Sequence, residues 1–188
     1  MVTEPNQLRL ARRNRLTLVG LFALALVPLT GAYWLYQSAR SERPWSTTNR
    51  GELLVPIRSV AELSLQSADG SAPLVDSGVW WLVTVSNGAC VDACEHALFQ
   101  LRQLHVLLGK DADRVKRAIV TLGDAPMDAA LEERFARLSW LSGDSAALRA
   151  GVYIVDPLGN LVLYYPYADA DKPVLEDLKK LLQVSHIG

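Results

Sequence analysis

Cys90 and Cys94 are the residues whose type and spacing most directly indicate chemistry, and they are the only two cysteines of the chain. They follow an apolar run at residues 79–85 and precede a segment with helical periodicity, so a strand leads into a helix at the pair. The positive end of the helix dipole favours a thiolate there, whereas Asp92 and Glu95 oppose it with negative charge. Two sulfurs one helical turn apart can close a disulfide or bind a soft metal ion together.

The elements that position the pair alternate between strand and helix. Residues 79–85 are typical of a buried strand, and residues 94–108 place apolar side chains three and four positions apart, as one face of a helix does. The same patterns predict further elements downstream: a strand at 115–122, a helix at 127–138, strands at 151–155 and 161–165, and a closing helix at 172–183. Residues 51–78 carry short apolar groups broken by glycine and proline, which predicts short strands or a hairpin. This order predicts a three-layer α/β domain with a parallel strand–helix–strand unit and an antiparallel hairpin.

Residues 16–36 form an uncharged run of 21 residues, LTLVGLFALALVPLTGAYWLY. At about 1.5 Å per residue this helix spans roughly 30 Å, the thickness of the hydrocarbon core of a bilayer. Arginines precede the run and aromatic residues cluster at its far end, which indicates that the N-terminus is cytoplasmic. The alternative is a cleaved signal peptide, but residues 37–39 make a poor cleavage site. We therefore predict a single-pass anchor in the inner (plasma) membrane, with the lipid bilayer as a partner and a periplasmic C-terminal domain.

The predicted organisation has four parts: a cytoplasmic basic arm at 1–15, a transmembrane helix at 16–36, a stem at 37–50 and a domain at 51–188. The arm holds four arginines and one glutamate, a net charge of +3, so the remaining residues carry −4 of the total of −1. A mildly acidic domain without a basic run does not indicate a nucleic-acid binder.

The chain resembles the Sco/SenC family of membrane-anchored, thioredoxin-like factors of cytochrome oxidase assembly. The resemblance covers roughly residues 50–185 and is carried by the anchor, the C-x-x-x-C spacing at 90–94 and the turn Asp156-Pro157-Leu158-Gly159, in that order. It implies a thioredoxin-like fold, a cytochrome oxidase subunit or a copper chaperone as partner, and copper as cofactor.

The chain departs from that family at the metal ligands. Sco proteins bind copper through the two cysteines and a histidine before the hairpin, and residues 147–151 contain no histidine. His96 diverges from Cys94 around the helix, His105 lies about 16 Å along it and is predicted to be a partly buried core residue, and His186 lies near the chain end. Met127 is a soft donor, but a methionine at a helix start more often fills a core gap. The remaining metal hypothesis is Cu(I) held by Cys90 and Cys94 alone.

These observations lead to two main hypotheses. In the first, the protein is an accessory factor of oxidase assembly that acts by thiol–disulfide exchange or transient copper handling. Cys90, expected to be the more exposed cysteine, would attack, and Cys94, on the apolar face, would resolve. In the second, the protein is a non-catalytic thioredoxin-like docking module with a structural disulfide. A broad disulfide reductase or peroxiredoxin-like enzyme is disfavoured, because Ala150 and Gly151 occupy the zone where thioredoxin-type enzymes carry a cis-proline.

Overall fold

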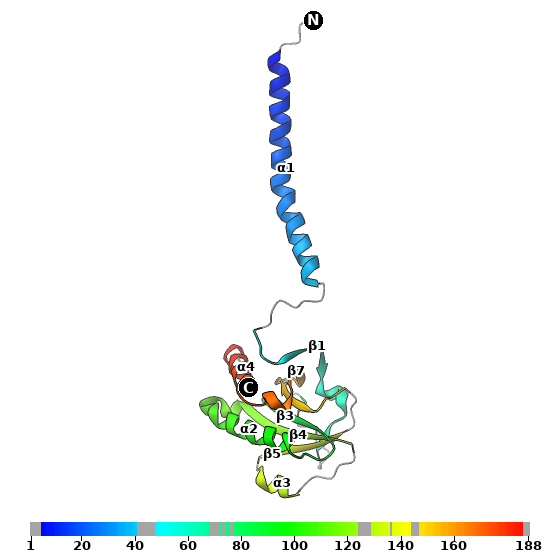
Figure 1. Cartoon of the computed structure of the whole chain (residues 1–188), viewed down its shortest axis with the longest axis vertical. Helices are drawn as coiled ribbons and strands as arrows, with labels where there is room; N and C mark the ends of the chain where they lie inside the picture. Colours follow the sequence, from blue (N-terminus) through cyan, green and yellow to red (C-terminus); the bar gives the residue numbers. More distant parts are fainter. Residues whose placement is uncertain are drawn as a thin grey trace. The chain divides into compact units, whose positions relative to one another are not determined.

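The computed structural model describes residues 5–40, 48–67, 72, 74–75, 77–123, 129–135, 137–143 and 147–185. The chain divides into two compact units, Met1–Thr48 and Asn49–Gly188. Figure 1 shows both units.

In the first unit, the described residues form the helix α1 (Pro5–Arg40). Its segment Thr17–Ser38 is apolar and long enough to cross a membrane, and its side chains are not buried against protein. At 1.5 Å per residue the segment measures about 33 Å. The helix predicted over residues 16–36 is therefore confirmed, and it continues to Arg40, four residues into the range predicted as the stem. The stem residues 41–47 lie outside the described residues, and the anchor's insertion and orientation stay predictions.

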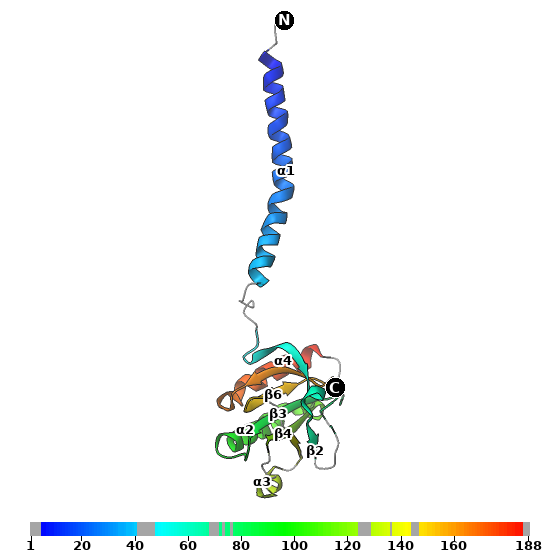
Figure 2. The same ribbon diagram turned by 90° about the vertical axis from the view of Figure 1, so that its right-hand side faces the viewer.

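The second unit contains one sheet. Within the described residues its strands run in the order β1-β7-β6-β3-β4-β5-β2. Their bounds are β1 Glu52–Ser59, β2 Gln66–Ser67, β3 Trp80–Asn87, β4 Val115–Leu122, β5 Leu138–Gly143, β6 Gly151–Val155 and β7 Asn160–Tyr165. β3 pairs in parallel with β4, and β4 with β5, while β6 and β7 pair antiparallel as the predicted hairpin. Figure 2 shows β6, β3 and β4 in succession.

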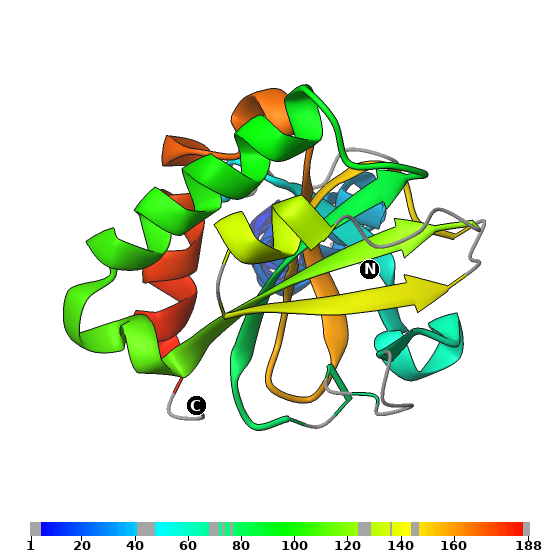
Figure 3. The same cartoon turned by 90° about the horizontal axis from the view of Figure 1, so that it is seen from below.

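The helices gather on one face of this sheet. They are α2 (Ala93–Leu107), α3 (Ala129–Arg134) and α4 (Lys172–Val184). The described residues also form three short 3-10 turns, η1 (Val60–Leu63), η2 (Gly109–Arg114) and η3 (Tyr167–Asp169). α2 and α4 bury their apolar stripes against β3, β6 and β7. Figure 3 shows α2 and α4 on one side of the strands and η1 on the other. The predicted α/β architecture is confirmed, and among the described residues η1, Leu65 and Leu74 cover the other face of the sheet.

The alternation of side chains along β3 divides the core between these layers. Trp80 packs in the cluster under α2 and α4, while Trp81 packs in the cluster under η1, and both are buried. Successive side chains of a strand point to opposite faces, so adjacent apolar residues must be covered on both sides. This explains why the run at 79–85 is apolar except for Thr84, which is buried as well.

One sequence prediction was wrong in its bounds, and another left two alternatives that the structure decides. In the described part of the helix predicted over 127–138 the structure has α3, and Leu138 begins β5 instead, after Arg137 adopts a left-handed φ of +64°. Met127 lies outside the described residues. Of the two alternatives predicted for residues 51–78, separate strands form rather than a hairpin, since β1 pairs with β7 and β2 pairs with β5 at the opposite edge.

Candidate redox site

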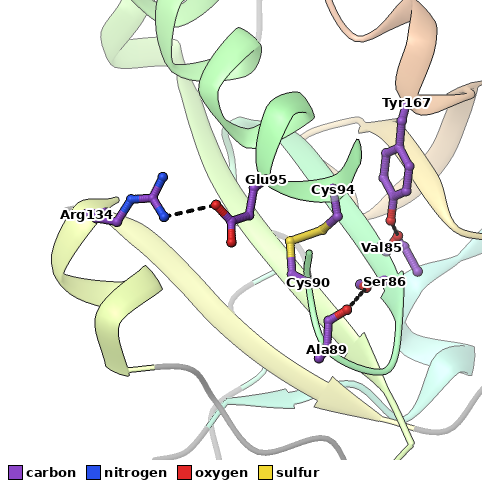
Figure 4. The surroundings of a disulfide bond; sticks show 8 residues. All are labelled: Val85, Ser86, Ala89, Cys90, Cys94, Glu95, Arg134 and Tyr167. Atoms are coloured by element: carbon purple, nitrogen blue, oxygen red, sulfur yellow. Dashed lines mark hydrogen bonds and ion pairs between the residues drawn. A yellow bond between two sulfur atoms is a disulfide. The ribbon is translucent and has the colours of Figure 1, made fainter. Parts of the chain in front are cut away.

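The two cysteines lie where β3 leads into α2. Cys90 is in the connecting loop and Cys94 is in the first turn of α2, and a disulfide joins them (Figure 4). Their Cα atoms are 5.3 Å apart, within the range that a disulfide bridges. The structure thus brings together the pair that the sequence predicted.

Both sulfurs lie in an apolar cluster. Cys90 is 7 % exposed and Cys94 is 3 % exposed. They pack against α2, β4 and α3 through Leu98, Ile119, Leu131 and Phe135. The expected order of exposure therefore holds, but the difference is small, because Cys90 is buried as well. Apolar neighbours oppose thiolate formation, whereas the N-terminus of α2 favours it.

Two hydrogen bonds hold the loop that carries Cys90 at the end that follows β3. The Gly88 N–H donates to the Leu122 carbonyl at 3.1 Å, and the Ser86 hydroxyl donates to the Ala89 carbonyl at 3.2 Å. Between the cysteines, Asp92 has a positive φ of +43°, a conformation that non-glycine residues seldom adopt. The position of Cys90 is therefore set by this turn as well as by the disulfide.

Arg134 of α3 balances a negative charge beside the disulfide. Its Nη1 lies 2.9 Å from Oε2 of Glu95, the residue directly after Cys94, and Figure 4 shows the two side chains meeting across the gap between α2 and α3. The sequence identified Glu95 as a charge that opposes a thiolate and missed Arg134. No local signal identifies this partner, because it comes from another helix 39 residues later.

Tyr167 approaches the same cluster from η3. Its ring packs against the cysteine cluster, and its hydroxyl donates to the Val85 carbonyl of β3 (Figure 4). Burial raises the pKa of the Tyr167 phenol above its usual value, with a smaller opposing effect of Ser86. The phenol therefore stays protonated around neutral pH and acts as a hydrogen-bond donor. Sequence reasoning did not single out this residue.

The histidines are placed away from the sulfurs or outside the described residues. His96 is exposed on α2, with Nε2 3.1 Å from Nε2 of Gln100. His105 is half-buried, and its Nε2 donates to the carbonyls of Ala112 and Val115, as expected of a structural histidine. His186 lies outside the described residues. In the part of the chain that the structure describes, no three His, Cys, Asp or Glu side chains form a metal-binding group.

Residues 147–151 correspond to the stretch where Sco proteins carry their ligand histidine. In this chain, side chains of the stretch pack in the core or form an ion pair. Leu148 is buried in the cluster under η1. Arg149 lies over the Tyr164 ring at 4.0 Å, and its Nη2 is 2.8 Å from Oε2 of Glu52 on β1. The described residues therefore do not fit a copper centre with three protein ligands.

Comparison with known proteins agrees with this architecture. Residues 80–185 match a family model described as transmembrane-like, thioredoxin-like, C-terminal domain. The solution structure of apo Sco1 from Thermus thermophilus is 20 % identical, with a TM-score of 0.55, over 72 % of this chain and 98 % of that chain. Yeast Sco1 is 14 % identical, with a TM-score of 0.51, over 65 % of this chain and 96 % of that chain. Bradyrhizobium japonicum ScoI with copper bound is 22 % identical, with a TM-score of 0.46, over 63 % and 96 %.

The comparison with curated proteins finds no match. At these identities, the likeness to the Sco structures concerns the fold, and at that level it confirms the resemblance seen in the sequence. The match over residues 80–185 covers more than half of the chain and includes both cysteines, β3, α2 and the hairpin. The chain therefore belongs to the family of transmembrane-like, thioredoxin-like C-terminal domains.

Proposed function

We propose that this protein is a membrane-anchored accessory factor of cytochrome oxidase assembly that exchanges disulfides with a partner through Cys90 and Cys94. The observation that carries the proposal is the disulfide at the N-terminus of α2 in a thioredoxin-like fold. The role in oxidase assembly rests on the resemblance to Sco proteins in anchor, cysteine spacing and turn. A cytochrome oxidase subunit or a copper chaperone is the proposed partner.

The exchange uses both sulfurs in turn. In the reduced protein, the Cys90 thiolate attacks a disulfide of the partner, which forms a mixed disulfide and releases one partner thiolate. The Cys94 thiolate then attacks Sγ of Cys90, which restores the Cys90–Cys94 disulfide and releases the second partner thiolate. Two electrons pass to the partner, and a dithiol reductant must return them before the next cycle.

Two side chains support this chemistry. Arg134 offsets the charge of Glu95, so the dipole of α2 can favour a thiolate at its N-terminus. Tyr167 holds the end of β3, just before the loop that carries Cys90. Because both sulfurs are buried, exchange requires the loop at 88–92 to open.

Trapping tests the exchange directly. Cys94→Ser removes the resolving sulfur, so a mixed disulfide through Cys90 should accumulate in membranes and appear on non-reducing gels. Cys90→Ser is the matched control and should give no adduct of this kind. Absence of an adduct from Cys94→Ser, with the full chain present at normal levels, would contradict the proposal.

A second function is favoured by the burial of both sulfurs. In this alternative, the disulfide is structural and the domain acts as a docking module. The reduction potential of the full chain, measured by equilibration with dithiol buffers and trapping of free thiols, separates the two functions. A value near about −200 mV supports exchange, and a value below about −300 mV supports the structural role.

Copper is proposed here as a transient cargo. The reduced pair offers two thiolates, which are the donors that Cu(I) prefers. Titration of the reduced full chain with Cu(I) should therefore give binding that Cys90→Ser and prior oxidation both abolish. Retention of stoichiometric Cu(II) through desalting would contradict this proposal, because it would require ligands beyond the two cysteines.

The proposed location is the inner membrane, with the N-terminus cytoplasmic and the thioredoxin-like domain in the periplasm. The arginines before the apolar segment and its span of about 33 Å support this topology. Alkaline phosphatase fused after the C-terminus should be active, because this enzyme folds in oxidising compartments. An inactive fusion present at normal levels would reverse the orientation.

A further inference from the structure

An open groove of about 1040 Å³ lies between α2 and the segment that connects α3 to β5. We call it the cationic groove. Its charged lining comprises Arg102, Asp113, Lys116, Arg117, Glu133, Arg134 and Arg137. Five of these side chains are positive and two are negative, which leaves a net charge of +3.

This charge is local, since the unit that contains the groove is acidic. Residues 49–188 contain thirteen lysines and arginines against eighteen aspartates and glutamates, a net charge of −5. A positive groove on a negative domain focuses an attractive field on one site and repels acidic segments elsewhere. Its ligand is therefore expected to be negatively charged and directed to this face.

Two arginines of the groove approach each other. Arg117 of β4 is 9 % exposed, whereas Arg102 of α2 is exposed. Burial lowers the pKa of the Arg117 guanidinium, and repulsion by Arg102 lowers it further. A carboxylate placed between them would be attracted by both charges and would relieve this repulsion.

The groove continues toward the disulfide through a neighbouring hollow lined by Glu95, Phe99 and Arg134. Glu95, Phe99, Arg102 and Val106 are spaced four, three and four residues apart, so they form one stripe on α2. Phe99 is 50 % exposed and Val106 is 72 % exposed. At one end of the stripe, Arg134 both lines the groove and pairs with Glu95 beside Cys94. From Glu95 to Val106 the stripe is about 16 Å long, which matches about five residues of extended chain.

We propose that the cationic groove binds an acidic segment of the partner protein, with carboxylates at the arginines and apolar side chains on Phe99 and Val106, and so brings the partner's cysteine to Cys90–Cys94. The inference rests on the proposed function and names the chemistry of the partner. Charge complementarity selects the partner, and contacts with Phe99 and Val106 set the direction of the bound segment along α2.

The experiment uses the oxidised full chain in phosphatidylcholine nanodiscs and two synthetic peptides. One peptide alternates glutamate with leucine and ends in a single cysteine, and the other has glutamine in place of glutamate. The rate at which each peptide thiol opens the Cys90–Cys94 disulfide is measured at low and high salt. The variant Arg102→Gln/Arg137→Gln removes two exposed groove charges, and Lys172→Gln/Lys179→Gln removes two exposed charges on α4 as the matched control.

The glutamate peptide should react about tenfold faster than the glutamine peptide at low salt, and high salt should remove the advantage. The groove variant should lose the advantage and the α4 control should keep it. Equal rates for both peptides, with normal reduction by dithiothreitol, would overturn the proposal that the groove binds an acidic segment. The proposed disulfide exchange would remain intact.

If no thiol opens the disulfide, the exchange function fails and the groove is tested by affinity alone. Serine-ended versions of both peptides are then titrated into the full chain. Tighter binding of the glutamate version, lost in the groove variant, sustains the inference, and equal binding overturns it. Groove-dependent binding to phosphatidylglycerol vesicles, without preference between the peptides, would also overturn it, because the ligand would then be lipid.

Discussion

Asp177 and Glu95 are carboxylates on two helices that cover the same face of the sheet, yet their surroundings differ. Asp177 is 1 % exposed, and its Oδ2 accepts the Arg50 and Gly51 N–H groups at 2.6 and 2.9 Å and the Tyr165 hydroxyl at 2.9 Å. The Glu95 side chain is 31 % exposed and pairs with Arg134, which is 61 % exposed.

The difference separates a buried stabilising carboxylate from one whose charge lies beside the proposed redox pair. A buried carboxylate with three donors ties the start of the domain to α4 and β7, and any lost partner leaves polar groups buried. A partly exposed ion pair contributes little to stability, but its charges act on the adjacent sulfurs. Stability is therefore expected to depend on the Asp177 region, and reactivity on the region of Glu95 and the disulfide.

The largest effect should come from Asp177→Ala. The substitution leaves the Tyr165 hydroxyl and two backbone N–H groups without their acceptor, so the free energy of unfolding should fall by about 3 kcal/mol. Denaturant unfolding of the full chain in detergent measures this loss. Glu176→Gln is the matched control on the same helix, since it removes only exposed ion pairs with Arg50 and Lys172 and should cost less than about 1 kcal/mol. Equal losses in both variants would break the comparison.

Reduction of the disulfide should lower the free energy of unfolding by less than Asp177→Ala does. Only three residues separate Cys90 from Cys94, and the chain-entropy model gives about 2 kcal/mol for so short a loop. Unfolding of the full chain with and without a thiol-free reductant measures the difference, with the Cys90→Ser/Cys94→Ser variant as the reductant-insensitive control. A loss above about 4 kcal/mol would show that the disulfide end stabilises the fold as much as Asp177 does.

Alkaline pH should lower the stability of the protein through Tyr165 in the Asp177 region and Tyr167 beside the disulfide. Burial raises the pKa of Tyr165, assisted by its hydrogen bond to Asp177, and burial also raises the pKa of Tyr167 beside the disulfide. Because both folded values exceed the unfolded value of about 10, this stabilisation is complete below about pH 10 and is lost as pH rises above it. The free energy of unfolding should fall by up to about 1.4 kcal/mol per pH unit for each tyrosine.

Tyr165→Phe and Tyr167→Phe should each reduce this alkaline slope. At neutral pH, Tyr165→Phe should also lose about 1 kcal/mol, because Asp177 loses a donor. Unfolding curves at about pH 9 and about pH 11 compare the variants. A slope that neither substitution changes would assign the alkaline loss to other groups.

The sequence predicted the centre of the fold better than its edges. Local pattern and tertiary structure agree in β3, β4, β6, β7, α2 and α4, because each has a mostly apolar run or a clear helical stripe. Phe135 and Leu138 continued the apolar spacing of a helix, but Leu138 pairs with Arg117 as the start of β5. Pairing with β4 decided this segment, and a short window of sequence contains no information about it.

Only part of the site was predicted from the sequence, because its other members are brought there by tertiary packing. The cysteine pair and its position at a helix start are local features, so spacing alone identified them. Arg134 lies 39 residues from its partner Glu95, and Tyr167 lies 82 residues from Val85. Their places near the sulfurs follow from α3 and η3 packing on α2 and β3, which no local motif encodes. The low exposure of Cys90 has the same origin, because α3 covers a loop that the sequence indicates to be open.

Substitutions in the Glu95–Arg134 ion pair should have the smallest effects on stability. They also give the sharpest test of the difference between Glu95 and Asp177. Glu95→Gln leaves the positive charge of Arg134 near the cysteines, which favours the reduced thiolate form and should raise the reduction potential. Arg134→Gln leaves the negative charge of Glu95 and should lower it. Each shift should stay below about 30 mV, since the pair is partly exposed, and the free energy of unfolding should change by less than about 1 kcal/mol. Equilibration of each full-length variant with dithiol buffers measures the potentials. Shifts of the same sign would mean that packing of α3, rather than charge, acts on the disulfide, and a large loss of stability would make Glu95 a second structural carboxylate like Asp177.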